Sequence, residues 1–260
     1  MTILVKVGSA LISEGPRVRF PWLAQKVWEI ASLIEEGHRF LIVSSGAVAA
    51  GMELQGVTIR PTDVLDLQLL SGIGQVRLMK YYKDLFRERG VSVAQILLTH
   101  HNFASERERD NITQIVDSYL ERGIVPVVNE NDMVDKEEFD GRNSFSDNDM
   151  LAAIVAVNAR VDMAVLLTDV DGLFASDPKH SNETRFIDEV DTVTTEIEEM
   201  ATNEANPLGI GGMRSKVLAA RQITESGIPV LVASGNHPLA DIIEGRVRST
   251  RFHPQLSNTA

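Results

Sequence analysis

The sequence contains no cysteine, and this absence excludes two kinds of site. Without cysteine the chain can form neither disulfide bonds nor thiolate metal centres. Nothing therefore indicates an oxidising compartment, and we expect a cytoplasmic protein. The amino terminus, MTILVKVGSAL, lacks the long apolar core and the cleavage site of a secretory signal. No apolar run approaches the roughly 20 residues that a bilayer-spanning helix needs, so we expect no membrane association.

Basic residues are scarce relative to acidic ones. The 260 residues include 25 Lys and Arg against 37 Asp and Glu, which gives a formal net charge of −12. Nucleic-acid-binding proteins usually present a basic face, so this balance argues against a nucleic acid partner. If the protein handles an anionic substrate, it must gather a few lysines locally. Those lysines are the first residues to look for.

The rest of the composition is that of an ordinary globular protein, with 43% hydrophobic and 24% charged residues. Apolar strand-like runs alternate with helical patterns almost throughout the chain. The strand-like runs are continuously apolar, as expected when helices cover both faces of a sheet. We therefore predict an α/β fold with a mainly parallel sheet between two layers of helices, in a single domain over residues 1–260.

Two elements of this fold can be predicted in more detail. Apolar residues at helical spacing predict one long helix: Leu65, Leu69, Ile73, Val76 and Leu85. The short run from Thr250 to Phe252 predicts a closing strand at the edge of the sheet.

Short acids and amides are concentrated in one stretch, residues 129–150, which reads NENDMVDKEEFDGRNSFSDNDM. An apolar run precedes it and a helical pattern follows it. Such a cluster at the ends of two regular elements suits a site that binds ammonium groups, orients lysines or lies near a metal-bound phosphate. The alternative is a set of solvated turns in which Asp147 to Asp149 cap the following helix.

Other polar and glycine residues also follow directly after strands. The segments concerned are VKVGSA, IVSSGA, VVNEND, LLTDVDG and VLVASG. In open parallel sheets, ligands bind at the carboxyl ends of the strands. We therefore expect these segments to meet at one edge of the sheet.

Two lysines stand where an anion could be bound. Lys216 lies one turn inside a helix that LGIGGMRSK opens, where glycine backbone and the helix N-terminus favour a phosphate. The segment is not a P-loop, and a simple helix start is the alternative. Lys6 interrupts an apolar strand, which is costly unless its amine reaches an anion or a polar site. Its alternative is an amine that extends to solvent.

The remaining patterns narrow the chemistry. Ser45 in SSGA lacks the preceding glycine of a nucleophile elbow, which argues against a Ser-His-Asp hydrolase. His100 and His101 are adjacent, so their side chains do not face one another as metal ligands would. Two lysines, two glycine turns and an acid–amide cluster favour phosphoryl transfer. Asp149 could hold both lysines, and Mg²⁺ would be bound mostly by nucleotide phosphates and water.

Six blocks of the sequence, in this order, resemble the amino acid kinase family: VKVGSA, IVSSGAVAAG, VVNENDMV, SDNDMLAA, LLTDVDGLF and GIGGMRSK. The resemblance extends from Lys6 to about His253. It implies a three-layer αβα sandwich whose N-terminal part binds glutamate and whose C-terminal part, from about residue 150, binds ATP. It also implies ATP- and Mg²⁺-dependent phosphorylation of the L-glutamate side-chain carboxylate to L-glutamyl 5-phosphate, the first step of proline biosynthesis.

The resemblance further implies which residues form the site. Lys6 and Lys216 would contact the phosphates, and Asp149 would organise both lysines. The glutamate-binding residues would be Ser45, Gly46, Ala47, Asn129, Asp132 and Asn148, with Asp132 suited to the ammonium group. The ATP-binding residues would be Lys6, Gly8, Ser9, Thr168, Asp169, Ile210, Gly211, Gly212, Met213, Arg214, Ser215 and Lys216. No metal ligand is expected from protein side chains.

The chain departs from the family pattern in two places. Ile210 stands where many members carry Thr, so one hydroxyl contact to the nucleotide would be missing. Many bacterial members continue into a C-terminal PUA domain, which we expect this chain to lack. The resemblance also implies feedback inhibition by proline, with the polar segment 132–143 as its place, and a homo-oligomer, either dimer or tetramer.

Two alternatives to a glutamate kinase remain at this point. The first is another carboxylate kinase of the same family, acting on N-acetylglutamate or aspartate. The predicted ammonium partner Asp132 argues against an acetylated acceptor, because an acetylated amine carries no charge. The second is a non-catalytic module that senses amino acids. The presence of Lys6, Lys216 and Asp149 argues against it, since a degenerate sensor would be expected to have lost one of them.

Overall fold

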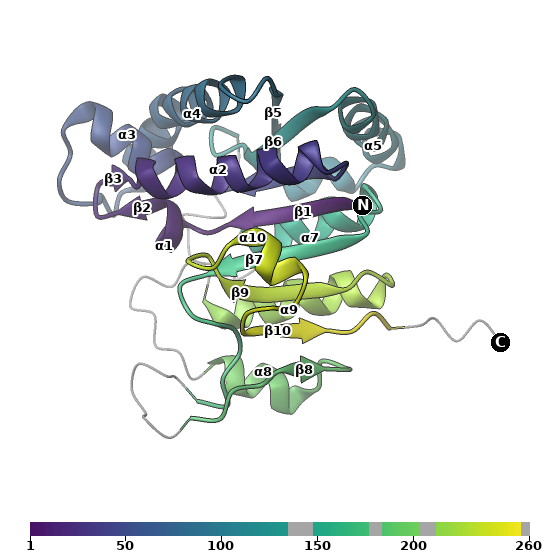
Figure 1. Ribbon diagram of the computed structural model, residues 1–260. Helices are drawn as coiled ribbons and strands as arrows, with labels where there is room; N and C mark the ends of the chain where they lie inside the picture. The colour runs from purple at the N-terminus through teal and green to yellow at the C-terminus, as the bar shows by residue number, and fades with distance from the viewer. Residues whose placement is uncertain (135–147, 177–183, 203–211, 256–260) are drawn as a thin grey trace.

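The computed structural model describes residues 1–134, 148–176, 184–202 and 212–255. Its centre is an eight-stranded sheet in the order β5-β6-β4-β1-β7-β9-β10-β8 (Figure 1). These strands are β1 (Thr2–Val7), β4 (Arg39–Ser44), β5 (Ser92–Leu98), β6 (Ile124–Glu130), β7 (Met163–Thr168), β8 (Glu189–Val190), β9 (Val230–Ser234) and β10 (Ser249–Phe252). A separate hairpin is formed by β2 (Ser13–Glu14) and β3 (Arg17–Val18).

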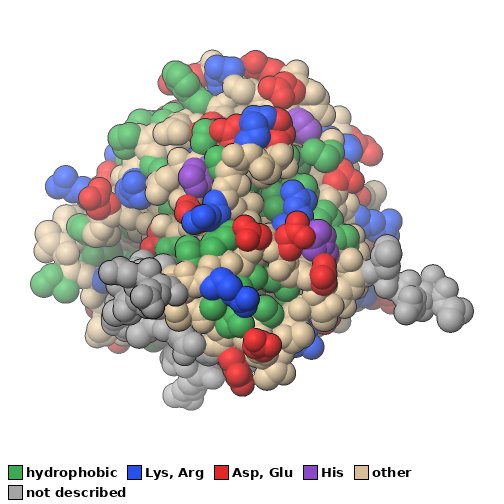
Figure 2. Space-filling view, turned by 60° about the horizontal axis from the view of Figure 1, so that its bottom comes forward, with side chains coloured by type: hydrophobic (Ala, Val, Ile, Leu, Met, Phe, Trp, Pro, Cys, Tyr) green, Lys and Arg blue, Asp and Glu red, His purple; other side chains and the backbone are tan. Residues whose placement is uncertain are grey.

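The helices are α1 (Ser9–Ile12), α2 (Phe20–Glu35), α3 (Ala47–Gln55), α4 (Val64–Arg87), α5 (Glu106–Glu121), α7 (Asn148–Asn158), α8 (Thr195–Thr202), α9 (Met213–Glu225) and α10 (Leu239–Ile243), with a 3-10 turn at His100–Phe103. No helix in the described ranges is both long and apolar enough to cross a membrane. On the face shown in Figure 2, the described Lys and Arg side chains are interspersed with Asp and Glu.

The predicted three-layer αβα architecture is confirmed. Successive residues of each strand point to opposite faces of the sheet, and both faces are buried. In β1, Leu4 belongs to a core formed with α5, α7 and α9, whereas Ile3 and Val5 belong to a core formed with α2, α4 and α10. In Figure 1, α2 and α10 lie in front of the sheet, and α7 and α9 lie behind it.

The sheet is mainly parallel, as predicted, with one antiparallel pair between β9 and β10. The prediction that Thr250 to Phe252 form a strand is confirmed, but the prediction that this strand lies at the edge of the sheet is wrong. These residues do form β10, but the two-residue strand β8 pairs with its outer side. With two residues, β8 is too short to show an apolar period, so the sequence pattern does not predict this strand.

The long helix α4 is confirmed, but of the five apolar residues that predicted it only Leu85 is buried in the core. Leu65, Leu69, Ile73 and Val76 are all exposed, and Val76 is 74% exposed. The buried face carries apolar residues together with three polar ones, Gln68, Ser71 and Gln75. The period of the apolar residues thus predicts the helix correctly but does not identify its buried side.

Two glycines let α4 cross α3 at very short range. A Cβ on Gly74 would lie 1.8 Å from the Ala47 carbonyl oxygen, and a Cβ on Gly51 would lie 2.0 Å from that of Leu70. No side chain fits at either point, since real Cβ atoms do not approach other atoms so closely. This crossing fixes the buried face of α4 next to the loops that follow β4 and β6.

Candidate active site

The predicted site residues that the structure describes lie at one edge of the sheet. Because β1, β4, β6, β7 and β9 run parallel, their carboxyl ends share this edge. Lys6 is the penultimate residue of β1, Ser45 follows β4, and Thr168 ends β7. Asn129 is the penultimate residue of β6, which runs two residues further than the apolar sequence pattern.

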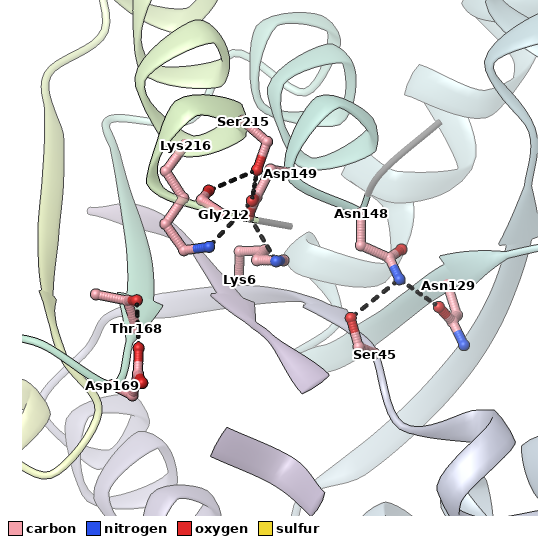
Figure 3. Close-up of polar contacts among 10 residues, drawn as sticks. All are labelled: Lys6, Ser45, Asn129, Asn148, Asp149, Thr168, Asp169, Gly212, Ser215 and Lys216. Atoms are coloured by element: carbon pink, nitrogen blue, oxygen red, sulfur yellow. Dashed lines mark hydrogen bonds and ion pairs between the residues drawn. The ribbon is translucent and has the colours of Figure 1, made fainter. Parts of the chain in front are cut away.

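Three of these residues form a buried lysine–aspartate cluster: Lys6, Asp149 and Lys216 (Figure 3). Lys6 Nζ lies 2.6 Å from Asp149 Oδ1, and Lys216 Nζ donates a hydrogen bond to Asp149 Oδ2 at 3.1 Å. Asp149 is fully buried, and the lysines are 2% and 4% exposed. Charges so deeply buried are stable only when they are paired with an opposite charge. The Asp149 carboxylate is therefore needed to stabilise both ammonium groups.

Three separate elements supply the cluster. Lys6 comes from the central strand β1, Asp149 is the second residue of α7, and Lys216 lies in the first turn of α9. The position of Asp149 in the first turn of α7 also suits the positive end of that helix dipole. Ser215 Oγ is 2.6 Å from Asp149 Oδ2 and 2.9 Å from the Gly212 carbonyl oxygen, which ties the carboxylate to the start of α9.

The electrostatics of Asp149 follow from these contacts. Burial by itself raises the pKa of its carboxyl group. The charges of Lys216 and Lys6, with hydrogen bonds from Lys6 and Ser215, outweigh burial and hold the pKa well below its usual range. Asp149 is therefore ionised at neutral pH. With both amines protonated, the three side chains sum to one positive charge, in a chain whose net charge is −12.

Beside this cluster lies a neutral polar network, the amide network, formed by the side-chain amides of Asn129 and Asn148 and the hydroxyl of Ser45 (Figure 3). Asn148 Nδ2 donates to Ser45 Oγ at 3.1 Å and to Asn129 Oδ1 at 3.2 Å. Asn148 and Asp149 are consecutive at the start of α7, so one helix turn joins the amide network to the lysine–aspartate cluster.

The turn after β4 requires a glycine at position 46. Gly46 has a φ of 110°, a conformation that other residues rarely adopt, and a Cβ there would lie 2.8 Å from Ile12 Cγ2. This geometry starts α3 at Ala47 and leaves Ser45 at the sheet edge. Ala47 itself is buried.

Asp132, the remaining predicted acceptor residue, is buried two positions beyond β6. Its carboxylate accepts a hydrogen bond from Ser71 Oγ, and its carbonyl oxygen accepts one from Gln68 Nε2 at 2.6 Å. Gln75, one turn further along α4, accepts from Asn129 Nδ2 at 2.9 Å. Sequence reasoning missed these three α4 residues. Their spacing of three and four residues on one helix face was the available signal.

The predicted nucleotide residues are distributed around the cluster. Thr168 Oγ1 lies 3.3 Å from the carboxylate of Asp169, which is exposed. Gly8 lies next to Lys6, because a Cβ on Gly8 would be 3.5 Å from Lys6 Nζ, and Ser9 is exposed at the start of α1. In α9, the Met213 side chain packs in the core and Arg214 is exposed. Ile210 and Gly211 lie outside the described residues.

The donor set of this edge fits an anionic phosphate better than a bare metal ion. Among the residues that the structure describes, no group of three or more His, Asp or Glu side chains could hold a metal. Two ammonium groups and the backbone at Gly8 and Gly212 are donors for phosphate oxygens. The amide network offers hydrogen bonds to a second, polar molecule beside them. The arrangement is thus suited to holding two substrates, one of them phosphorylated.

Comparison with known proteins agrees with this geometry. Residues 1–234 match the model of the amino acid kinase family. The chain is 34% identical to the glutamate 5-kinase of Lactococcus lactis, a match that spans 96% of this chain and 94% of that protein. It is 40% identical to the glutamate 5-kinase of Thermus thermophilus, spanning 96% of this chain and 67% of that protein.

Solved structures of low sequence identity share the fold. The carbamate kinase from Giardia lamblia bound to AMP-PNP has a TM-score of 0.65 at 13% identity and covers 97% of this chain, with 98% of its own chain matched. The isopentenyl phosphate kinase of T. acidophilum, in a product complex, has a TM-score of 0.64 at 17% identity, covering 97% of this chain and all of its own. By its sequence blocks, its family match and its fold, the chain belongs to the amino acid kinase family.

Proposed function

We propose that the protein phosphorylates the side-chain carboxylate of L-glutamate with ATP, giving L-glutamyl 5-phosphate and ADP. The observation that carries this proposal is the lysine–aspartate cluster in a chain 34–40% identical to glutamate 5-kinases over nearly its whole length. A carboxylate oxygen of glutamate attacks the γ-phosphorus of ATP, and the bond to the β,γ-bridging oxygen breaks. The reaction is the first step of proline biosynthesis.

Lys6 and Lys216 stabilise the transferring phosphoryl group. Each carries a full positive charge at a buried position, where electrostatic interactions are stronger than in water. Asp149 holds both amines within 3.1 Å of its own oxygens, so no reorganisation is needed when negative charge spreads over the phosphoryl oxygens. Mg²⁺ bound to the ATP phosphates supplies further charge neutralisation.

The two substrates occupy opposite sides of the cluster. Ser45, Gly46, Ala47, Asn129, Asp132 and Asn148 form the glutamate side. Gly8, Ser9, Thr168, Asp169 and residues 210–216 form the ATP side. The division is supported by the amide network, which lies at the ends of β4 and β6, whereas Thr168 and α9 lie beyond β1 on the other half of the sheet.

Purified protein is expected to form glutamyl hydroxamate when ATP, Mg²⁺, glutamate and hydroxylamine are supplied together. Hydroxylamine traps the acyl phosphate product, so the coloured hydroxamate reports the carboxylate phosphorylation directly. Parallel reactions with N-acetylglutamate and aspartate separate this activity from the other carboxylate kinases of the family. Folded protein that binds ATP but makes no hydroxamate would instead support an amino-acid-sensing module.

Asp132→Ala is expected to raise the glutamate KM by about 10- to 100-fold, the equivalent of one hydrogen bond to a charged group. The reason is that the Asp132 carboxylate, held by Ser71, is positioned to bind the substrate ammonium, which does not react. We expect kcat to stay within about threefold, since this contact is equal in ground and transition states. Asp117→Ala, an exposed aspartate on α5, is the matched control. A normal KM with a reduced kcat would contradict the assignment.

Three further properties belong to this proposal. We infer feedback inhibition by proline, measured as loss of hydroxamate when proline is added. The segment predicted as the place of this inhibition is 132–143, and its residues from 135 on lie outside the described residues.

We infer a homo-oligomer, dimer or tetramer, supported by the exposed apolar row of α4 and tested by sedimentation. We infer a cytoplasmic location, where ATP is available for the proposed reaction.

A further inference from the structure

The buried glutamine Gln75 on α4 contacts one of the predicted glutamate-binding residues but was not itself predicted to bind glutamate. Gln75 is 7% exposed, and its Oε1 accepts a hydrogen bond of 2.9 Å from Asn129 Nδ2. The close crossing at Gly74, the preceding residue, holds this part of α4 against α3. Gln75 is therefore fixed in place by backbone packing rather than by its own hydrogen bond alone.

The direction of each hydrogen bond in this region is determined by one backbone group. The Glu130 backbone N–H can only donate, and it donates to Asn129 Oδ1 at 2.9 Å. The Asn129 amide must therefore present its oxygen to Glu130 and its Nδ2 to Gln75. Since Asn129 Oδ1 also faces Asn148, the group that Asn148 turns towards it has to be the donor Nδ2.

This arrangement of donors and acceptors leaves one hydrogen-bond acceptor of the amide network available to a ligand. Asn148 uses its Nδ2 on Asn129 and Ser45, and its Oδ1 is buried with no partner in the part of the chain that the structure describes. A buried carbonyl oxygen without a donor is costly unless a ligand supplies one. At neutral pH the only hydrogen-bond donor that glutamate carries is its ammonium group.

We propose that Gln75 is a positioning residue which, through Asn129, keeps the Asn148 carbonyl oxygen available for the ammonium group of the acceptor. The inference rests on the proposed function, whose acceptor it makes more specific. Removing the Gln75 oxygen leaves Asn129 Nδ2 buried without an acceptor. Only the hydrogen bond from the Glu130 backbone N–H then opposes rotation of the Asn129 amide, so the orientation of Asn148 is imposed less strongly. The residue thus contributes to selecting acceptors with a free amine.

The test compares glutamate with glutarate, which has the same two carboxylates but no amine. Gln75→Met keeps the length of the side chain and removes its oxygen. We expect it to weaken glutamate binding about tenfold, a typical effect of leaving a buried donor unsatisfied. Glutarate binding should change less than about twofold, and kcat with glutamate less than about threefold. Dissociation constants by calorimetry, with KM and kcat from the hydroxamate assay, give both readouts.

Three further variants distinguish positioning from general damage. Gln75→Glu retains an acceptor oxygen and is expected to recover most of the glutamate preference. In an Asn129→Ala background, Gln75→Met should have no additional effect, because its influence passes through Asn129. Gln25→Leu, which removes an exposed glutamine from α2, should change nothing. If Gln75→Met does not fold, Gln75→Ala replaces it in the same measurements.

Equal weakening of glutamate and glutarate would overturn the inference, and so would an unchanged preference. Either result, with an active wild-type enzyme, leaves the proposed function standing. Failure of the wild type to make hydroxamate would instead contradict the proposed function. The calorimetric ratio of glutamate to glutarate still decides the role of Gln75 in that case, since it requires no turnover.

Discussion

Alanine at position 6 or 216 is expected to lower kcat by about 10²- to 10³-fold, as the loss of one preorganised donor to a developing charge does. Each substitution removes one of the two ammonium groups held on Asp149. Because the phosphoryl charge is redistributed mainly in the transition state, the glutamate KM should stay within about threefold. Steady-state hydroxamate assays over a range of glutamate and ATP concentrations measure both constants.

The effect on turnover must be separated from loss of stability, since each variant also leaves Asp149 with only one of its two lysine partners. Lys26→Ala is the matched control. Lys26 is also a buried lysine, paired with Glu29 at 2.7 Å on α2, and it lies outside the lysine–aspartate cluster. We expect this variant to unfold at a lower temperature and to keep kcat within a few-fold. A similar loss of turnover in Lys26→Ala would show that Lys6 and Lys216 act through stability.

The second large effect is expected for Asp149→Asn, which keeps the shape of the side chain and removes its charge. Two buried ammonium groups then face a neutral amide. Breaking a buried ion pair by removing one partner costs about 3–5 kcal/mol of folding free energy. Activity should fall at least as far as in the single lysine variants, because both amines lose the group that positions them. Urea denaturation at pH 7 measures the stability, and the hydroxamate assay measures the activity.

The pH dependence of this stability difference has a definite sign. The folded-state pKa of Asp149 lies well below the unfolded value of about 3.9. Its stabilising contribution is therefore complete above the unfolded pKa and is lost as pH falls towards the folded pKa. The gap between wild type and Asp149→Asn should be constant from about pH 5 to 7 and shrink below pH 3.9 by up to about 1.4 kcal/mol per pH unit.

Asp84→Asn is a suitable comparison for both measurements. Asp84 also pairs with basic side chains, Lys80 and Arg87, but on the surface of α4. Its substitution should shift the urea midpoint only slightly, because exposed ion pairs contribute little. A gap for Asp149→Asn that is equally small, or that does not change between pH 5 and pH 3, would contradict a buried, doubly paired carboxylate.

Most of the sheet could be predicted from the sequence, because strands covered on both faces leave continuous apolar runs. The edge rule for parallel strands then places Lys6 and Asn129 near each other although they lie far apart in the chain. What could not be predicted is the side of α4 that is buried. Between residues 65 and 76 its exposed row is more apolar than the face turned inward, since that face holds Gln68, Ser71 and Gln75 next to the end of β6.

The candidate site was predictable for a different reason. Lys6 is conspicuous as a charge in an apolar strand, and Lys216 follows a glycine-rich helix start, so each residue carries its own signal. The acid–amide stretch could not be divided by such signals, since Asp132, Asn148 and Asp149 have similar side chains. The resemblance to the amino acid kinase family implied their division, and in the structure Asp149 contacts the two lysines whereas Asn148 contacts Ser45 and Asn129.

The central position of β1 has a consequence for how the protein is made. β1 is synthesised before the other strands of this sheet, and β4 can pair with one of its edges once residue 44 is available. Its other edge belongs to β7, which ends at Thr168. Any nascent chain shorter than this exposes a row of unpaired backbone groups along a strand of buried, apolar residues, the kind of edge that promotes aggregation. One edge of the central strand therefore stays unpaired during synthesis until residue 168 has been made.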